Sequence, residues 1–157
     1  LQIGEADCMV CAGMGGPLMM RILTQGREKA YAMKELILQP QSEIALFRAF
    51  LRQEGYKVVA EDMVYEDGKY YPMMKVTPSK NRTKEIPEEQ PLFDAFGEML
   101  LTEKHPVLQA YIDHSIKQEK ELLQHLAKQE TTRAEERMGQ IEEKLALLQK
   151  AKEYMSA

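Results

Sequence analysis

Apolar residues in the first half of the chain alternate between short continuous runs and stretches with helical spacing. Residues 8–12 form one run, and the glycines after it end a predicted buried strand before Pro17 begins a helix. Residues 35–38 form a second run, and Ser42 is positioned to cap the helix that follows. Two successive strand-and-helix units predict two parallel strands with right-handed crossovers.

A β-hairpin is predicted to complete this half of the chain. Residues 56–64 and 69–76 are strand-like, and the Asp67-Gly68 pair between them is typical of a hairpin turn. Two parallel strands and one hairpin make a thin sheet whose edge and faces need cover. We therefore expect further strands from a preceding segment, and the chain also begins with Leu1 rather than Met.

The second half is predicted to be helical. Residues 77–91 are polar and contain three prolines, which is typical of a linker. A short helical piece near residues 92–100 and two long helices follow; the first begins near Pro106, and Thr132 with Glu135 forms a capping box on the second. Coiled-coil spacing is seen for Ala134, Met138, Ile141, Leu145 and Leu148. The pattern predicts a domain in residues 1–76, the linker, and a helical coiled-coil hairpin in residues 92–157.

Composition narrows the class of protein. No apolar run reaches the roughly 18 residues of a membrane span, and the net charge of −4 gives no general attraction to nucleic acid. Cys8 and Cys11 are too few for a disulfide framework, and on a strand their side chains would point to opposite faces, which disfavours a redox pair. The three histidines lack the spacing of a helical zinc motif, so we assign no metal. These features favour a cytoplasmic protein.

The glycine loop, residues 12–16 (AGMGG), is the candidate site in the first half. It follows a predicted strand and precedes a helix, so its backbone could approach a ligand closely. The loop lacks the full G-x-G-x-x-G spacing of a dinucleotide site and the Lys-Ser or Lys-Thr of a phosphate-binding loop. The pattern alone leaves two readings open, a ligand-binding loop and a tight strand-to-helix turn.

Three motifs in order resemble the bacterial tRNA adenine-N1 methyltransferases that modify adenine 22. They are residues 12–16 (AGMGG), 36–40 (LILQP) and 61–71 (EDMVYEDGKYY). The tail, with FG at 96–97, LL at 100–101 and EKHP at 103–106, is similar to that family's helical extension. The chain departs from the family at Gln41, where many relatives have Asn, and at Glu98, where Pro is common. Neither position has a chemical role that we can assign.

The resemblance implies a Rossmann-like methyltransferase domain that uses S-adenosylmethionine, followed by a coiled-coil domain. This chain would then hold a partial sheet, with residues 8–12 as the fourth strand, residues 35–38 as the fifth and the hairpin as the sixth and seventh. The first three strands would lie in a missing N-terminal half, together with the Gly-Ser-Asp-His type loop and the acidic residue that hold the cofactor. We therefore expect this chain alone to be inactive.

The resemblance also implies roles for particular residues. The backbone of Ala12, Gly13, Met14 and Gly15 would contact the cofactor. Apart from the resemblance, we expect contacts with the tRNA substrate from Gly16, Gln39 and Pro40 at this loop, from the Tyr71 ring, and from Lys117 and Lys120 on a helical hairpin that would help to hold tRNA. The catalytic side chains are not assigned.

The chemistry of the implied reaction agrees with this loop. N1 of adenine has a free lone pair at neutral pH and needs no strong general base, so catalysis consists mainly of alignment and electrostatics. The glycine loop accordingly lacks the Asn or Asp that amino-methylating relatives place there. Because N1 lies on the pairing edge, the target base must be unpaired or flipped.

Two other functions remain open at this point. The helical hairpin could be a protein-interaction module beside a vestigial half-sheet, or the chain could be half of a methyltransferase that acts on DNA or protein. An upstream segment with a glycine-rich strand-to-helix loop and a following acid would favour the enzyme.

Overall fold

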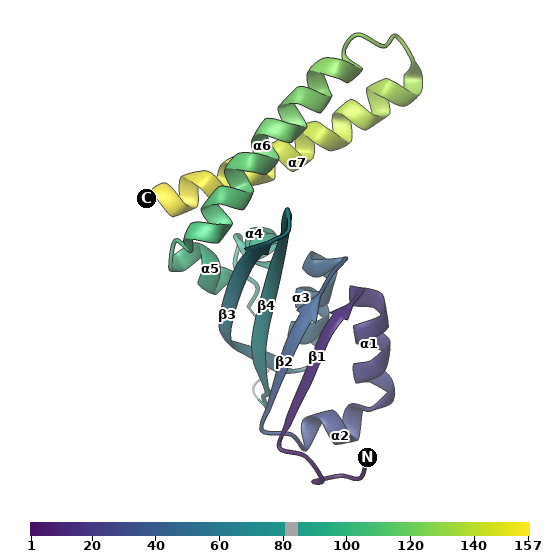
Figure 1. The fold of residues 1–157 in the computed structure, drawn as a ribbon, viewed down its shortest axis with the longest axis vertical. Helices are drawn as coiled ribbons and strands as arrows, with labels where there is room; N and C mark the ends of the chain where they lie inside the picture. The colour runs from purple at the N-terminus through teal and green to yellow at the C-terminus, as the bar shows by residue number, and fades with distance from the viewer. Residues whose placement is uncertain (81–84) are drawn as a thin grey trace. The chain divides into compact units, whose positions relative to one another are not determined.

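The computed structural model describes residues 1–80 and 85–157, and these divide into two compact units, Leu1–Leu100 and Leu101–Ala157. The first unit is an α/β structure built on a four-stranded sheet (Figure 1). Its elements, in chain order, are β1 (Cys8–Met14), α1 (Gly16–Gln25), α2 (Arg27–Tyr31), β2 (Glu35–Pro40), α3 (Ile44–Gln53), β3 (Tyr56–Glu66), β4 (Lys69–Pro78) and α4 (Gln90–Phe96). The short helix α5 (Glu98–Thr102) follows.

The strand order within the described residues is β1-β2-β4-β3. β1 and β2 are parallel, β4 runs antiparallel to β2, and β3 and β4 form the predicted hairpin. Asp67 and Gly68, at φ 49° and 78°, make the two-residue turn, because both central positions of a type I′ turn need positive φ. The mixed sheet predicted from the sequence is confirmed, with longer strands than the pattern indicated.

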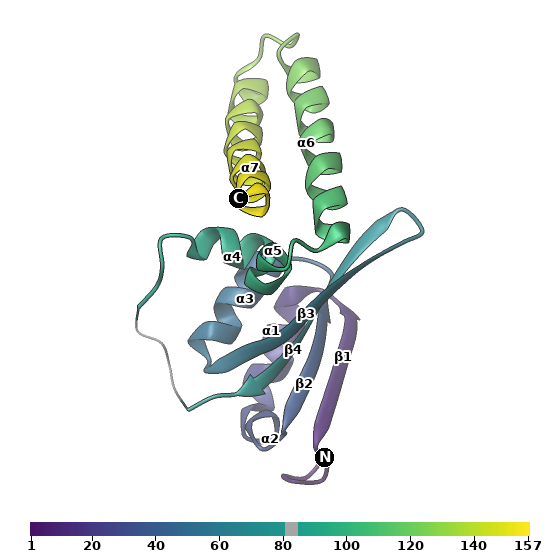
Figure 2. The same cartoon turned by 90° about the vertical axis from the view of Figure 1, so that its left-hand side faces the viewer.

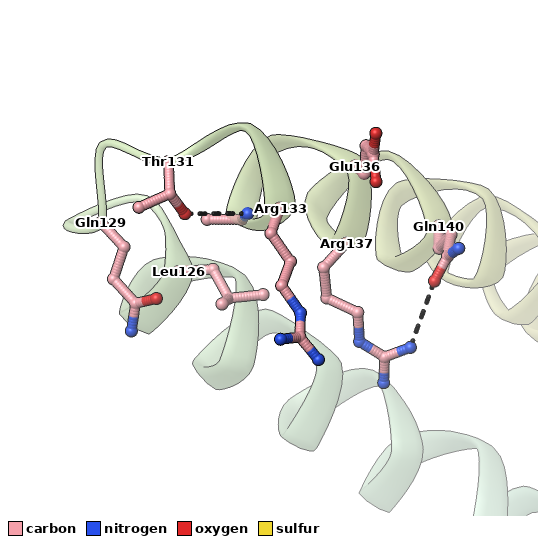
Figure 3. Close-up of a pocket in the computed structure, with 8 residues that line it drawn as sticks. Leu126, Gln129, Thr131, Arg133, Glu136, Arg137 and Gln140 are labelled. Atoms are coloured by element: carbon pink, nitrogen blue, oxygen red, sulfur yellow. Dashed lines mark hydrogen bonds between the residues drawn. The ribbon is translucent and has the colours of Figure 1, made fainter.

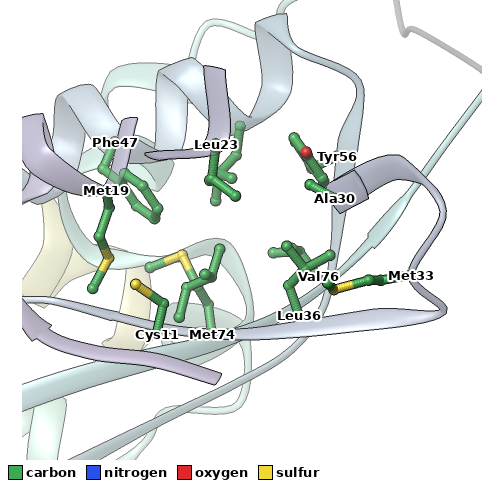
Figure 4. Close-up of a cluster of buried hydrophobic side chains, with 12 residues drawn as sticks. Cys11, Met19, Leu23, Ala30, Met33, Leu36, Phe47, Tyr56, Met74 and Val76 are labelled. Carbon is green, nitrogen blue, oxygen red and sulfur yellow. The ribbon is translucent and has the colours of Figure 1, made fainter. Parts of the chain in front are cut away.

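The hydrophobic core lies between one face of the sheet and helices α1, α2 and α3 (Figures 1 and 2). Alternate residues of the inner strands face it, since β2 follows a strict buried and half-buried alternation. Figure 4 shows side chains of this cluster, which include Cys11, Met19, Leu36, Phe47, Met74 and Val76. Burial of these side chains is the main stabilisation of the unit.

Residues 8–12 form a strand as predicted, but the prediction that this strand is buried is wrong. Cys11 is buried against the helices, whereas Cys8 is exposed and Val10 is 68% exposed on the other face. The reason is that α1, α2 and α3 cover only one face of the sheet, and alternate side chains of β1 point to the other face. Burial also raises the pKa of the Cys11 thiol, and both cysteines are free.

The predicted cap of α3 is also wrong. The N-cap residue is Glu43, which has a left-handed backbone at φ 52° and makes no side-chain capping bond. Ser42 turns instead toward the glycine loop, where its carbonyl and hydroxyl oxygens both accept from the amide of Gly16. A long-range contact has therefore replaced the local one.

A buried ion pair joins α3 to β3. The Arg48 guanidinium lies 3.1 Å from a carboxylate oxygen of Glu61, and the two side chains are 7% and 2% exposed. Burial lowers the pKa of Arg48, while the Glu61 carboxylate opposes that shift. The other Glu61 oxygen accepts from the amide of Met99, so the pair also holds the chain after α4.

Helix α4 belongs to the first unit. Arg52 on α3 makes two hydrogen bonds to the carboxylate of Asp94, at 2.5 and 3.1 Å. The sequence prediction begins the helical domain at residue 92, whereas the division by contacts falls between Leu100 and Leu101. Of the predicted linker 77–91, Thr77 and Pro78 are still part of β4, and residues 81–84 lie outside the described residues.

The second unit is an antiparallel pair of helices, α6 (Pro106–Leu126) and α7 (Thr132–Ser156). Its direction follows from two ion pairs, because Lys144 meets Glu119 and Lys152, further along α7, meets Asp113, earlier on α6. Residues between the helices are buried, including Leu108, Ile112, Ile141, Leu145 and Leu148. The hydroxyl of Thr131, not of Thr132 as predicted, caps α7 by accepting from the amide of Ala134 at 3.1 Å.

No helix in residues 1–80 and 85–157 combines the length and the apolar character required to cross a membrane. The same residues contain no group of three or more His, Cys, Asp or Glu side chains placed to hold a metal ion.

Candidate functional site

The candidate site lies where the parallel strands β1 and β2 end side by side. Ligands of open α/β sheets bind at the carboxyl ends of such strands. The glycine loop begins on the last residues of β1, and its register with β2 shifts between Ala12 and Met14. Gly13 takes a φ of +74° at this shift, a conformation that favours glycine.

Backbone contacts tie the glycine loop to the segment after β2. The amide of Gly13 donates to the side-chain oxygen of Gln39 at 2.8 Å, and the amide of Gln41 donates to the carbonyl of Met14 at 2.8 Å. The amide of Gly16 donates to the carbonyl of Ser42 at 3.0 Å. The two motifs predicted from the sequence, 12–16 and 36–40, therefore form one structure.

The three glycines of the loop have different surroundings. A Cβ atom on Gly13 would meet nothing closer than 4.0 Å, so this position faces open space. A Cβ on Gly15 would lie 2.8 Å from the Ser42 hydroxyl. A Cβ on Gly16 would lie 2.4 Å from the carbonyl oxygen of Ser42, which is backbone and cannot move aside. Gly13 leaves room for a ligand, whereas Gly16 closes the turn.

Gln39 carries the most informative polar group of the site. Its oxygen accepts from the amide of Gly13, which fixes the orientation of the carboxamide. Its nitrogen, Nε2, is buried and has no hydrogen-bond partner among the described residues. Because buried polar groups are normally paired, a donor without a partner here indicates a ligand or water contact.

The other predicted site residues are not all brought to this point. Ala12 is exposed, Met14 is half-buried and its sulfur lies 3.8 Å from the Cys11 thiol, and Pro40 is buried at the end of β2. Tyr71 is half-buried on β4, opposite Val64 of β3. Tyr71 lies beyond Met74, which makes the last β4 pair with β2 at Leu38.

Lys117 and Lys120 are exposed on α6, in the second unit. A cavity of about 450 Å³ lies at the turn between α6 and α7. Figure 3 shows its lining, in which Arg133 and Arg137 both extend toward α6. This cavity was not predicted from the sequence, although the spacing of the two arginines by four places them on one face of a helix.

Two functional candidates could not be found by motif alone. Ser42 has no recognised motif role, yet it contacts both Gly15 and Gly16 across a separation of 26 residues or more in sequence. The paired rings of Tyr65 and Tyr70 near the hairpin turn, 4.7 Å apart, are the second. The signal for the second was present in the sequence, because a two-residue turn places these positions opposite each other.

The chain is similar in sequence to known proteins. A family sequence model described as TrmK, tRNA (adenine(22)-N(1))-methyltransferase, matches residues 1–150. The curated tRNA (adenine(22)-N(1))-methyltransferase of Bacillus subtilis (strain 168) is 41% identical over 71 residues, which are 45% of this chain and 30% of that protein.

Solved structures give the same fold. An uncharacterized protein of Listeria monocytogenes serotype 4b is 26% identical with a TM-score of 0.82, over 92% of this chain and 62% of that one. A Streptococcus pneumoniae protein, described as a candidate tRNA (m1A22) methyltransferase and solved with S-adenosyl-L-methionine, is 26% identical with a TM-score of 0.71, over 92% of this chain and 59% of that one. The mixed sheet with its helices is therefore a Rossmann-like α/β fold. The chain spans less than two thirds of each of these relatives.

Proposed function

Because the chain belongs to the TrmK family of tRNA (adenine(22)-N(1))-methyltransferases, we propose that the protein containing it methylates N1 of an adenine in tRNA. The family match over residues 1–150 is the observation that carries this proposal. The contact between the glycine loop and Gln39, at the carboxyl ends of parallel strands, supports it, since this is where such a fold binds its ligands.

We propose that a preceding half of the same domain completes the sheet, in a full-length protein longer than this chain. The free edge of β1 and the exposure of Val10 support this, because parallel strands are normally covered on both sides. That half would bring the remaining cofactor contacts, including those expected from its Gly-Ser-Asp-His type loop. Residues 1–76 would then contribute only part of the methyl-transfer site.

The residues present fit their share of a site for S-adenosylmethionine. When bound, S-adenosylmethionine supplies an electrophilic methyl group on its sulfonium sulfur. The backbone of Ala12, Gly13, Met14 and Gly15 would line the cofactor site. The space beside Gly13 is open, and the hydrogen bond from the Gly13 amide to the Gln39 side chain fixes the loop. A backbone-lined loop suits a reaction in which the ring nitrogen has no proton to remove.

Substrate contacts are proposed for the residues on the β2 side of the loop. Gln39 would donate from Nε2 to an acceptor on the target nucleotide, while the half-buried Tyr71 provides apolar surface and the buried Pro40 fixes the backbone at the end of β2. Gly16 would act through the backbone conformation, because its own amide is already bonded to Ser42. A donor in this position orients the base and leaves the N1 lone pair free for the methyl group.

For residues 101–157, the second unit, we propose a coiled-coil hairpin that holds tRNA rather than performing chemistry. Lys117 and Lys120 are exposed cations on α6 and would meet backbone phosphates. The reaction would take place in the cytoplasm, where tRNA is found.

The test is methylation of unmodified tRNA by the full-length protein, with labelled S-adenosylmethionine and mapping of the methylated base by primer extension. We expect incorporation at one adenine, a stop at that base because N1-methyladenine cannot pair, and no incorporation when that adenine is replaced by guanine. Absence of label, or label at another atom, would overturn the proposal. The 157-residue chain alone should incorporate no label, and robust incorporation by it would refute the proposed missing half.

A further inference from the structure

The β3–β4 hairpin continues beyond the body of the sheet. The last residue pair between β2 and β4 is Leu38 with Met74, whereas β3 and β4 remain paired through Glu66 with Lys69. Five β3–β4 pairs therefore lie beyond that point, from Asp62↔Met73 to Glu66↔Lys69. At about 3.4 Å per residue the arm, residues 62–73, extends roughly 15 Å past its last contact with β2.

The arm projects from the same end of the sheet as the glycine loop. β2 ends at Pro40, and β4 runs antiparallel to it, so the start of β4 lies at the carboxyl end of β2. Both views show the hairpin turn further out than the ends of β1 and β2 (Figures 1 and 2). A nucleic acid bound at the carboxyl ends of these strands would come within reach of the arm.

An aromatic pair occupies the outer part of the arm. Tyr65 and Tyr70 are directly opposite each other in the β3–β4 register, with ring centroids 4.7 Å apart and planes inclined by 47°. Tyr65 is 58% exposed, and its neighbour Val64 is 39% exposed. An exposed ring that is supported by a second ring is already oriented, so it loses little freedom when a planar group stacks on it.

We propose that Tyr65 is a stacking platform for an unpaired tRNA base next to the methylated adenine. This inference rests on the proposed function, which requires the target base to be taken out of its pair. The charges of the arm agree with stacking and not with phosphate binding, because Glu66 and Asp67 outnumber Lys69 at the turn. Every base presents a π face, so such a contact needs no sequence-specific hydrogen bonds.

The first experiment measures the KM for unmodified tRNA with the full-length protein and its Tyr65→Ala, Tyr65→Phe and Val59→Ala variants. Stacking on one base predicts a rise of about 5- to 100-fold for Tyr65→Ala. The Tyr65→Phe variant should keep a KM close to that of the parent protein, since the ring remains. Val59 is exposed on the same strand but lies toward the opposite end of the sheet, so Val59→Ala should have no effect.

The salt dependence separates stacking from a charge contact. The fold-change caused by Tyr65→Ala should persist between low and high salt, because screening acts on phosphate contacts. A Tyr65→Trp variant adds a fluorophore to a chain that contains no tryptophan. Saturating tRNA should lower the tryptophan fluorescence of this variant by more than it lowers that of the parent protein.

A normal KM for Tyr65→Ala, an effect that vanishes at high salt, or unquenched Trp fluorescence at saturation would each overturn the inference. Loss of methylation by the parent protein would instead count against the proposed function itself. The two failures are therefore distinguishable.

Discussion

The side-chain oxygen of Gln39 accepts a hydrogen bond from the backbone amide of Gly13 at 2.8 Å, and this bond joins the ends of β2 and β1. It also leaves the Gln39 nitrogen as a buried donor without a partner among the described residues.

Gln39→Glu should separate the two functions of that side chain. The substituted carboxylate still accepts from Gly13, but it cannot donate, so an acceptor on the substrate would lose its partner. We expect a fall in kcat/KM of about 10-fold or more, in the range that follows from losing one buried hydrogen bond. Steady-state methylation measures it, and Gln53→Glu, at an exposed position on α3, is the matched control. Equal activity of both variants would show that Nε2 does not contact substrate.

Gly13→Val and Gly15→Val should abolish methyl transfer in the full-length protein. At Gly13 the side chain enters open space at the mouth of the site and the backbone must keep a positive φ, which costs a non-glycine residue about 1–2 kcal/mol. Methylation and circular dichroism are measured together. A folded variant with normal turnover would show that the loop is only a turn.

Gly16→Ala is the stability counterpart in the same loop. Its Cβ would lie 2.4 Å from the Ser42 carbonyl oxygen, so we expect a lower melting temperature, with a cost of about 1–3 kcal/mol as for other overpacked sites. Gly139→Ala on α7 is the control, because no atom lies within 4 Å of its Cβ and alanine favours a helix by roughly 0.5–1 kcal/mol. A melting temperature for Gly16→Ala at or above that of the parent would contradict the described packing.

Removing one partner of the Arg48–Glu61 pair should be strongly destabilising. Glu61→Gln leaves the Arg48 charge buried without its counterion, and such losses cost about 3–5 kcal/mol. Asp113→Asn, in the exposed pair with Lys152, should cost about 0–1 kcal/mol. Urea unfolding of the two variants gives the comparison, and similar costs would mean that the Arg48 site admits water.

The Tyr56 hydroxyl should make stability fall at alkaline pH. Burial raises its pKa to about 12, and the hydroxyl has no hydrogen-bond partner among the described residues. In the unfolded chain the tyrosine ionises near pH 10, whereas in the folded protein it stays neutral up to about pH 12. The stability that comes from this difference is fully present below pH 10 and is lost as the pH rises from about 10 to 12.

Thermal unfolding of Tyr56→Phe tests this. At pH 7 the variant should melt at the same or a higher temperature, because it removes an unpaired buried hydroxyl. Between pH 10 and 12 it should lose less stability than the parent protein. Parallel loss in both proteins would show that other groups cause the alkaline transition.

Deleting the residues after Thr102 should weaken tRNA binding and raise the KM for tRNA, with little change in S-adenosylmethionine affinity by calorimetry. Charge reversal of Lys117 and Lys120 should weaken tRNA binding more at low salt than at high salt, since screening removes phosphate attraction. Reversal of Lys57, exposed on β3, is the control. Unchanged tRNA affinity on deletion would favour a partner-binding or stabilising role for the hairpin.

The hairpin shows what could be predicted from local sequence. Asp67 and Gly68 specify a type I′ turn through their own backbone preferences, so the register of β3 and β4 follows from two residues. The helices α6 and α7 could also be predicted from local sequence. On α7, for example, Ile141, Leu145 and Leu148 recur at a spacing that places them on one face of a helix.

The site shows where local sequence was insufficient. The motif around residues 12–16 marked a loop, but two readings of it remained open. The tertiary structure brought Gln39 to Gly13 and Ser42 to Gly16, and these contacts depend on the pairing of β1 with β2. Ser42 was predicted to cap α3 because capping is a local preference. Its carbonyl and hydroxyl oxygens instead accept from the backbone amide of Gly16, which follows β1.

The sequence by itself determined the order of strands and helices, the turn of the hairpin and the positions of the family motifs, because each depends on neighbours within a few residues. Only the tertiary structure decided that β1 is an edge strand with Val10 exposed, that Arg48 and Glu61 form a buried pair, and which atoms of Gln39 are free. Burial and hydrogen-bond partners depend on groups far apart in the chain, and their identity is fixed only when the elements pack together.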